Sequence, residues 1–183
     1  EGAVITPLGL AALATNDGRG VFLKALETGQ ILTNNIAFGP SVNNAGSIPI
    51  GFDGENDMTL AGKISTGVSC SIPNLATGTL TLAGEMSAGT KTLTILGSGN
   101  TVLPIGSTIT GTTGGFGKTG AGTLTLAATN TLAGSTPLNG GTVVLDYATV
   151  NTNLIAQGTT ASALTLGGVD LQLKGGNFAQ ALG

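Results

Sequence analysis

The sequence predicts an all-β protein whose short strands stack into a β-solenoid. Apolar residues alternate with small polar ones over short runs, as in Gly122–Leu126, where Leu124 and Leu126 share one face of a strand. Glycine, asparagine or proline separates these runs, and 32 glycines in 183 residues supply the turns. A short motif also recurs at nearly constant spacing. These three features indicate many short strands joined by tight turns.

The recurring motif sets the length of the repeat. It occurs as Met58–Gly62, Leu80–Gly84, Leu124–Ala128 and Leu164–Gly168, each with Thr-Leu at its second and third positions. The starts are separated by 22, 44 and 40 residues, which is one, two and two periods of roughly 20–22 residues. Such a period with short strands indicates one coil per repeat. An antiparallel β-sandwich is the alternative, because it also needs short alternating strands.

Stacked coils would bury columns of aliphatic side chains, because a single coil has too little apolar area to fold alone. Threonine, a good strand former without charge, fills most outward positions. The predicted inward set is Leu60, Leu80, Leu82, Leu93, Ile95, Leu124, Leu126, Val143, Leu145, Leu164, Leu166, Leu171 and Leu173.

Residues 1–57 are predicted to form an irregular N-terminal part or capping coils, continuous as one domain with the repeats of residues 58–183. Val21–Leu23 and Gln30–Leu32 are predicted strands, although Val21–Glu27 would serve equally as a short helix.

The longest apolar run is Leu8–Ala14, which is too short to span a bilayer. Its Ala12-Leu-Ala14 resembles a signal-peptide cleavage pattern, but no basic segment precedes it. We expect a buried strand or a short capping helix here, in a chain that is a processed product or a segment.

The most regular stretch, Gly115–Tyr147, resembles a known family. The matching residues are Lys118-Thr-Gly-Ala-Gly-Thr-Leu-Thr-Leu126, Asn130-Thr131, Gly134 and Asn139-Gly-Gly-Thr-Val-Val-Leu145. They resemble the autotransporter-associated β-strand repeat, found in the passenger regions of very large bacterial surface proteins. The resemblance implies a right-handed parallel β-helix outside the cell and identifies no reaction. It also favours a turn at Lys118–Gly120.

Charge is scarce and scattered. Charged residues are 8% of the chain, against roughly 25% in an ordinary soluble domain, and the net charge is −3. Nucleic-acid binding is not expected, because the basic residues form no cluster that could neutralise phosphates. They are Arg19, Lys24, Lys63, Lys91, Lys118 and Lys174.

Reactive residues are equally scarce. The absence of histidine excludes Ser-His-Asp and Cys-His arrangements and imidazole metal ligands. Gly115–Gly120 matches G-x-G-x-x-G, yet the strand-like Gly122–Leu126 follows it where a phosphate site needs a helix. Asp53-Gly-Glu55-Asn-Asp57 is interpreted as a solvated turn rather than a weak calcium loop. Cys70 cannot form an internal disulfide and is expected to be a small buried side chain.

We therefore expect no enzyme activity and no catalytic, cofactor-binding or metal-binding residue. The predicted function is structural: an extracellular segment of a bacterial surface protein or a self-assembling filament, with end-to-end or lateral association of copies. An adhesin that binds glycans is the alternative, and a polysaccharide-cleaving β-helix enzyme is less favoured. Thr-x-Thr motifs at Thr79, Thr92, Thr108 and Thr123 also suggest ice binding, a further, less favoured alternative.

Overall fold

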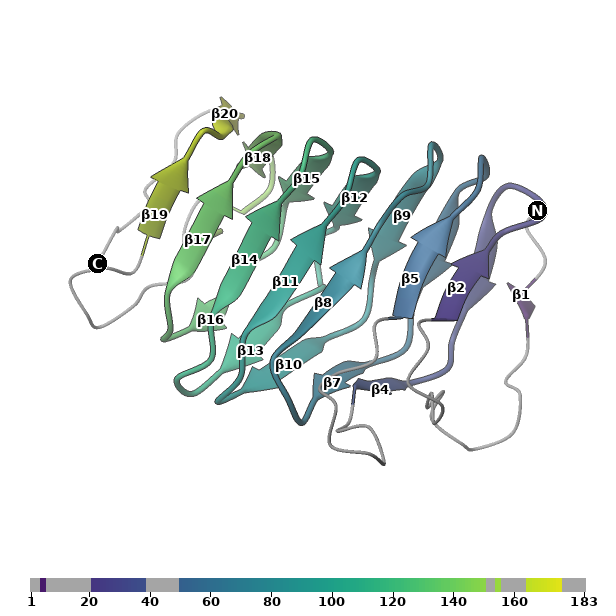
Figure 1. Ribbon diagram of the computed structural model, residues 1–183, viewed down its shortest axis with the longest axis horizontal. Coiled ribbons are helices and arrows are strands. Elements are labelled where there is room, and N and C mark those ends of the chain that lie inside the picture. Colours follow the sequence, from purple (N-terminus) through teal and green to yellow (C-terminus); the bar gives the residue numbers. More distant parts are fainter. Residues whose placement is uncertain (1–3, 6–20, 39–49, 151–153, 156–163, 176–183) are drawn as a thin grey trace.

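The computed structural model describes residues 4–5, 21–38, 50–150, 154–155 and 164–175. These residues contain strands and no helix, and the strands succeed one another along the long axis of the molecule (Figure 1). None of the described residues belongs to a helix that could cross a membrane. The run Leu8–Ala14 lies outside the described residues.

Three sheets run along the stack. Sheet 1 has the strand order β1 (Val4–Ile5), β3 (Gln30–Leu32), β6 (Met58–Leu60), β9 (Thr79–Leu82), β12 (Asn100–Leu103), β15 (Thr123–Leu126), β18 (Thr142–Asp146) and β20 (Asp170–Lys174). Sheet 2 has the order β4 (Ile36–Phe38), β7 (Ile64–Thr66), β10 (Met86–Gly89), β13 (Ile109–Gly111) and β16 (Thr131–Leu132). Sheet 3 has the order β8 (Cys70–Pro73), β11 (Leu93–Leu96), β14 (Phe116–Thr119), β17 (Thr136–Asn139) and β19 (Leu164–Gly167).

The paired strands β2 (Val21–Lys24) and β5 (Ile50–Asp53) continue sheet 3 at its N-terminal end, through the bridge between Phe52 and Asn74. Val21–Leu23 is thus part of a strand, and the helical alternative for Val21–Glu27 is wrong. The expected strand at Gln30–Leu32 is confirmed as β3.

Every paired strand in the described part of the chain runs parallel to its neighbour. Parallel pairing is inconsistent with the antiparallel sandwich and consistent with a β-helix or solenoid, because each strand pairs with the strand one circuit later. Along sheet 1 the successive paired positions are Ile31, Thr59, Thr81, Val102, Thr125, Val144 and Gln172.

The length of a circuit varies along the stack. In the middle, Asp57 bonds to Thr79 at a sequence separation of 22. Nearer the C-terminal end, Asp146 bonds to Lys174 at a separation of 28. The circuit from β15 to β18 is shorter than both, since Thr125 pairs with Val144. Sheets 1 and 3 nevertheless stay in register, whereas sheet 2 shifts register between Ser87 and Gly89, so the corners between strands absorb most of the differences in length.

The interior consists of aliphatic columns that follow this register. In sheet 1, Leu32 pairs with Leu60 and Leu60 with Leu82, while Leu126 pairs with Leu145. Nine members of the predicted inward set are buried: Leu60, Leu80, Leu82, Leu93, Ile95, Leu124, Leu126, Val143 and Leu145. The other four lie on the last described coil, where Leu164 and Leu171 are half-buried and Leu166 and Leu173 are each 54% exposed.

At the corners between sheets the backbones of successive coils come close together. Gly120 follows β14 with a φ of +82°, a conformation that side-chain-bearing residues rarely adopt. At Gly134, which follows β16, a methyl group would lie 2.5 Å from the carbonyl oxygen of Gly114. Glycine is therefore required at position 134, because a larger residue would clash with the backbone of the preceding coil.

Candidate functional site

A buried lysine is the most unusual group in the described interior. Lys118 lies on β14 with its side chain 1% exposed, and its paired positions are Ile95 and Leu138 in the neighbouring coils. It thus takes an inward position in an aliphatic column. The interpretation of Lys118–Gly120 as a turn is wrong for Lys118 and Thr119, which both belong to the strand, and right only for the corner at Gly120.

The Lys118 ammonium is held by backbone carbonyls where the chain leaves β14. Its Nζ donates to the oxygens of Thr119 at 3.1 Å and Gly120 at 2.7 Å, and to Gly140 of the next coil at 3.5 Å. Burial lowers the pKa of Lys118, because removal from water disfavours the charged form. The side chain therefore links two coils through their main-chain atoms.

Asn74 and Thr101 form a second buried polar contact. The Nδ2 of Asn74 donates to the hydroxyl of Thr101 at 3.0 Å and to the carbonyl of Asn100 at 2.9 Å. Its Oδ1 accepts a bond of 3.2 Å from the N–H of Ala76. Thr101 occupies the column position that Leu80 and Leu124 fill in the adjacent coils, so the amide compensates for a polar group inside the core.

Asn130 makes a third such contact, next to sheet 2. Its Oδ1 accepts from the N–H of Ile109 at 2.9 Å. Its Nδ2 donates to the carbonyls of Ala128 at 3.2 Å and Leu154 at 2.6 Å. As with Lys118 and Asn74, its partners are mainly backbone groups, so these polar side chains bond to the scaffold itself.

The G-x-G-x-x-G match at Gly115–Gly120 falls on strand β14. Phosphate loops hold their ligand with the free amides at the start of a helix, whereas β14 is hydrogen-bonded between β11 and β17. The lysine of the match is buried and bonded to carbonyl oxygens. This geometry does not support a nucleotide site.

The acidic cluster begins at Asp53, the last residue of β5, and continues onto the corner that follows. Asp53 accepts from the N–H of Gly54 at 2.7 Å, and Asp57 accepts from the N–H of Thr79 in the next coil at 2.7 Å. The carboxylates of Asp53, Glu55 and Asp57 are exposed. No group of three or more His, Cys, Asp or Glu is placed to hold a metal within the described ranges.

The Thr-x-Thr motifs lie on three different faces. Thr79 and Thr123 begin strands of sheet 1, Thr92 precedes a strand of sheet 3, and Thr108 precedes a strand of sheet 2. Between the two motifs of sheet 1 lies β12, which carries Asn100 and Val102 at the corresponding positions. The motifs therefore do not assemble into one threonine array.

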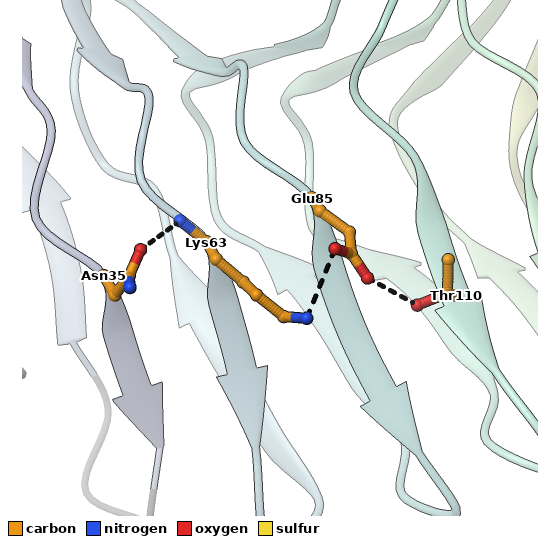
Figure 2. A network of polar contacts seen from close by, with 4 residues as sticks. All are labelled: Asn35, Lys63, Glu85 and Thr110. Carbon is orange, nitrogen blue, oxygen red and sulfur yellow. Dashed lines mark hydrogen bonds and ion pairs between the residues drawn. The ribbon is translucent and has the colours of Figure 1, made fainter.

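The exterior carries a short ladder of polar contacts across four coils (Figure 2). The N–H of Lys63 donates to Asn35 Oδ1 at 2.9 Å, and Lys63 Nζ lies 3.2 Å from Glu85 Oε2. The hydroxyl of Thr110 donates to Glu85 Oε1 at 3.2 Å. Because the side chains of Lys63 and Glu85 are 48% and 44% exposed, water weakens this ladder.

Cys70 is buried, as expected of a small apolar side chain, and pairs in register with Leu93 in the core. The comparisons with known proteins add no assignment: no protein-family model, curated protein or solved structure matches the chain.

The inward polar residues Asn74, Thr101, Lys118 and Asn130 were not identified from the sequence. A signal for one of them existed: with the coils aligned by period, Lys118 falls between Ile95 and Leu138. Alternation alone would then have placed it inside.

Proposed function

We propose that this chain is a structural, extracellular β-solenoid segment of a bacterial cell-surface protein or of a self-assembling filament. In this proposal the coils form a right-handed parallel β-helix with a repeat of roughly 20–22 residues. Bonds between neighbouring coils at sequence separations of 22, 23 and 21 support that repeat. We attribute the larger separation of 28 near each end to extra residues on those coils.

One observation carries the proposal: three buried polar side chains, Lys118, Asn74 and Asn130, are bonded across coils. Lys118 bonds to carbonyls of two successive coils, and Asn74 and Asn130 each bond to backbone groups of neighbouring circuits. Groups that an enzyme would direct at a substrate are here used to hold the stack together. This use favours a scaffold.

The outer surface supports the same role. The outward positions of the central coils are mainly uncharged, as at Thr81, Val102 and Thr125 of sheet 1. The resemblance of residues 118–145 to the autotransporter-associated repeat supports a location at the bacterial surface.

Three experiments test the proposal. Antibodies against the chain should label intact cells of the source bacterium, and surface proteolysis should remove the label. The monomeric purified chain should scatter X-rays as a rod whose eight sheet-1 strands span roughly 34 Å at about 4.8 Å per strand. An exclusively intracellular signal would reject the extracellular role, and specific binding on a glycan array would favour the adhesin alternative.

A further inference from the structure

The aliphatic columns of sheets 1 and 3 are exposed at the C-terminal end of the described stack. At the C-terminal end, β19 and β20 are the last strands of sheets 3 and 1 (Figure 1). Leu166 and Leu173 are each 54% exposed there, although their register partners Leu138 and Leu145 are 0% and 1% exposed. Among the described residues, the aliphatic columns are therefore open at the C-terminal end.

The free edge of β20 also presents main-chain groups. The N–H of Asp170 donates to the carbonyl of Gly141 at 2.9 Å, and the carbonyl of Lys174 accepts from the N–H of Tyr147 at 2.7 Å. These contacts turn the peptide groups of Asp170 and Lys174 towards β18. Because the direction of peptide groups alternates along a strand, Leu171 and Leu173 present theirs to the open side, where another strand would pair.

The sequence of this edge, Asp170-Leu-Gln-Leu-Lys174, is complementary to itself in the antiparallel direction. We propose that the open end binds a second copy of this chain, with β20 pairing antiparallel to the partner's β20 about a two-fold axis at Gln172. Asp170 then lies opposite the partner's Lys174, and Leu171 lies opposite the partner's Leu173. This inference rests on the proposed structural role and deepens it by naming the partner and the contact.

The backbone permits this register. Leu171 and the partner's Leu173 both direct their main-chain groups across the interface, so they form a hydrogen-bonded antiparallel pair. The same leucines continue the buried columns of sheet 1, because Leu171 follows Val143 and Leu173 follows Leu145. The interface therefore extends both the ladder and the apolar interior.

The charges favour the same register. Lys174 bonds to Asp146 of its own chain at 2.8 Å, but its side chain is 67% exposed, and an ammonium has three donors. By symmetry each dimer gains two contacts between Asp170 and the partner's Lys174. Parallel head-to-tail stacking would instead place β20 against β1, whose residues Val4 and Ile5 offer no charge to pair with Asp170 or Lys174. The charges of β20 thus favour the antiparallel dimer contact over head-to-tail stacking at this end.

Sedimentation equilibrium of the 183-residue chain tests this contact. The wild-type chain should show a monomer–dimer equilibrium. Asp170→Lys or Lys174→Asp alone places like charges opposite each other twice, so each should raise the dissociation constant roughly tenfold. An equimolar mixture of the two variants should recover the wild-type affinity, because only the mixed dimer pairs opposite charges at every position.

Ile105→Lys is the matched control for added charge, since Ile105 is 57% exposed on an internal coil between β12 and β13. It should leave dimerisation unchanged, whereas Leu173→Lys should abolish it. A chain that stays monomeric at all concentrations, grows without limit, or ignores the charge reversals would overturn the dimer. Rod-like scattering and cell-surface labelling are measured separately, so failure of the dimer would leave the structural role standing.

Discussion

Contact between coils at the corner glycines makes a sharp prediction for Gly134→Ala. The new methyl group would lie 2.5 Å from both the carbonyl carbon and oxygen of Gly114 and 2.6 Å from the oxygen of Thr113. Protein methyl groups essentially never approach closer than 3.0 Å, so the coils must move apart by the shortfall between these distances. That movement stretches the bond of 3.1 Å from Gly134 N–H to the Gly114 carbonyl.

The expected cost follows from these terms. Overpacking a rigid site costs about 1–3 kcal/mol, and a weakened backbone hydrogen bond adds up to about 1 kcal/mol. Alanine also reduces the conformational freedom of the unfolded chain, which stabilises the folded state by about 0.4–1 kcal/mol. We expect Gly134→Ala to lower the free energy of unfolding by about 1–3 kcal/mol, with a fall in Tm of roughly 2–12 °C for a chain of this size. Urea unfolding followed by circular dichroism measures the change.

Gly67→Ala is the control. Gly67 follows β7 in the same sheet and donates its N–H to the Phe38 carbonyl of the previous coil at 2.8 Å, as Gly134 does to Gly114. Its methyl group would meet only that carbonyl oxygen, at the ordinary distance of 3.7 Å. Its free energy of unfolding should be unchanged or about 0.5 kcal/mol higher. Equal losses for both variants, or a change below about 0.5 kcal/mol for Gly134→Ala, would refute the argument from coil contact.

Three further predictions concern polar contacts. Burial lowers the pKa of Lys118, so the unfolded chain binds the proton of this lysine more tightly than the folded chain does. The free energy of unfolding of the wild-type chain, compared with that of Lys118→Met, should therefore rise as pH increases from the lowered pKa towards 10.5. Denaturant titrations at several pH values measure this difference. Burial raises the pKa of Tyr147, but this residue is present in both chains and its effect cancels in the comparison. A difference in stability that stays constant with pH would contradict the reasoning. Thr101→Val removes an acceptor of Asn74 and should cost about 1–2 kcal/mol in urea unfolding, whereas an unchanged midpoint would show that the contact is not stabilising. Glu85→Gln removes the exposed ion pair with Lys63 and should cost less than about 1 kcal/mol; a larger loss, or one that persists in high salt, would mean that the ladder is better shielded than its exposure indicates.

The sequence predicted the stacked β architecture because alternation and period are local features. Leu124 and Leu126 could be placed inside by period two alone, and the motif spacing indicated which strands would be neighbours. Burial at the last coil could not be read this way, since Leu166 and Leu173 have the same pattern as Leu138 and Leu145 yet are half exposed. The sequence of a strand does not show whether another coil or chain covers it.

The inward polar residues failed prediction for a different reason. Hydrophobic pattern reading treats lysine and asparagine as surface residues, whereas Lys118 and Asn130 are buried because nearby carbonyls and amides of adjacent coils satisfy them. Only the three-dimensional positions of those main-chain groups show that a partner exists. The same limit applied to the G-x-G-x-x-G match, whose meaning depended on β14 being a central strand.

These polar contacts also address a problem that repeated leucine columns create. A stack of similar coils could shift by one period and still bury leucine against leucine, so apolar packing alone specifies the order of coils weakly. Thr101 interrupts the column of Leu80 and Leu124 and finds its donor in Asn74, and Asn130 finds an acceptor where Leu154 passes. A shifted stack would leave these buried groups without partners, at roughly 1–3 kcal/mol each. The interior polar groups therefore add specificity to a core whose leucine columns supply most of the stability.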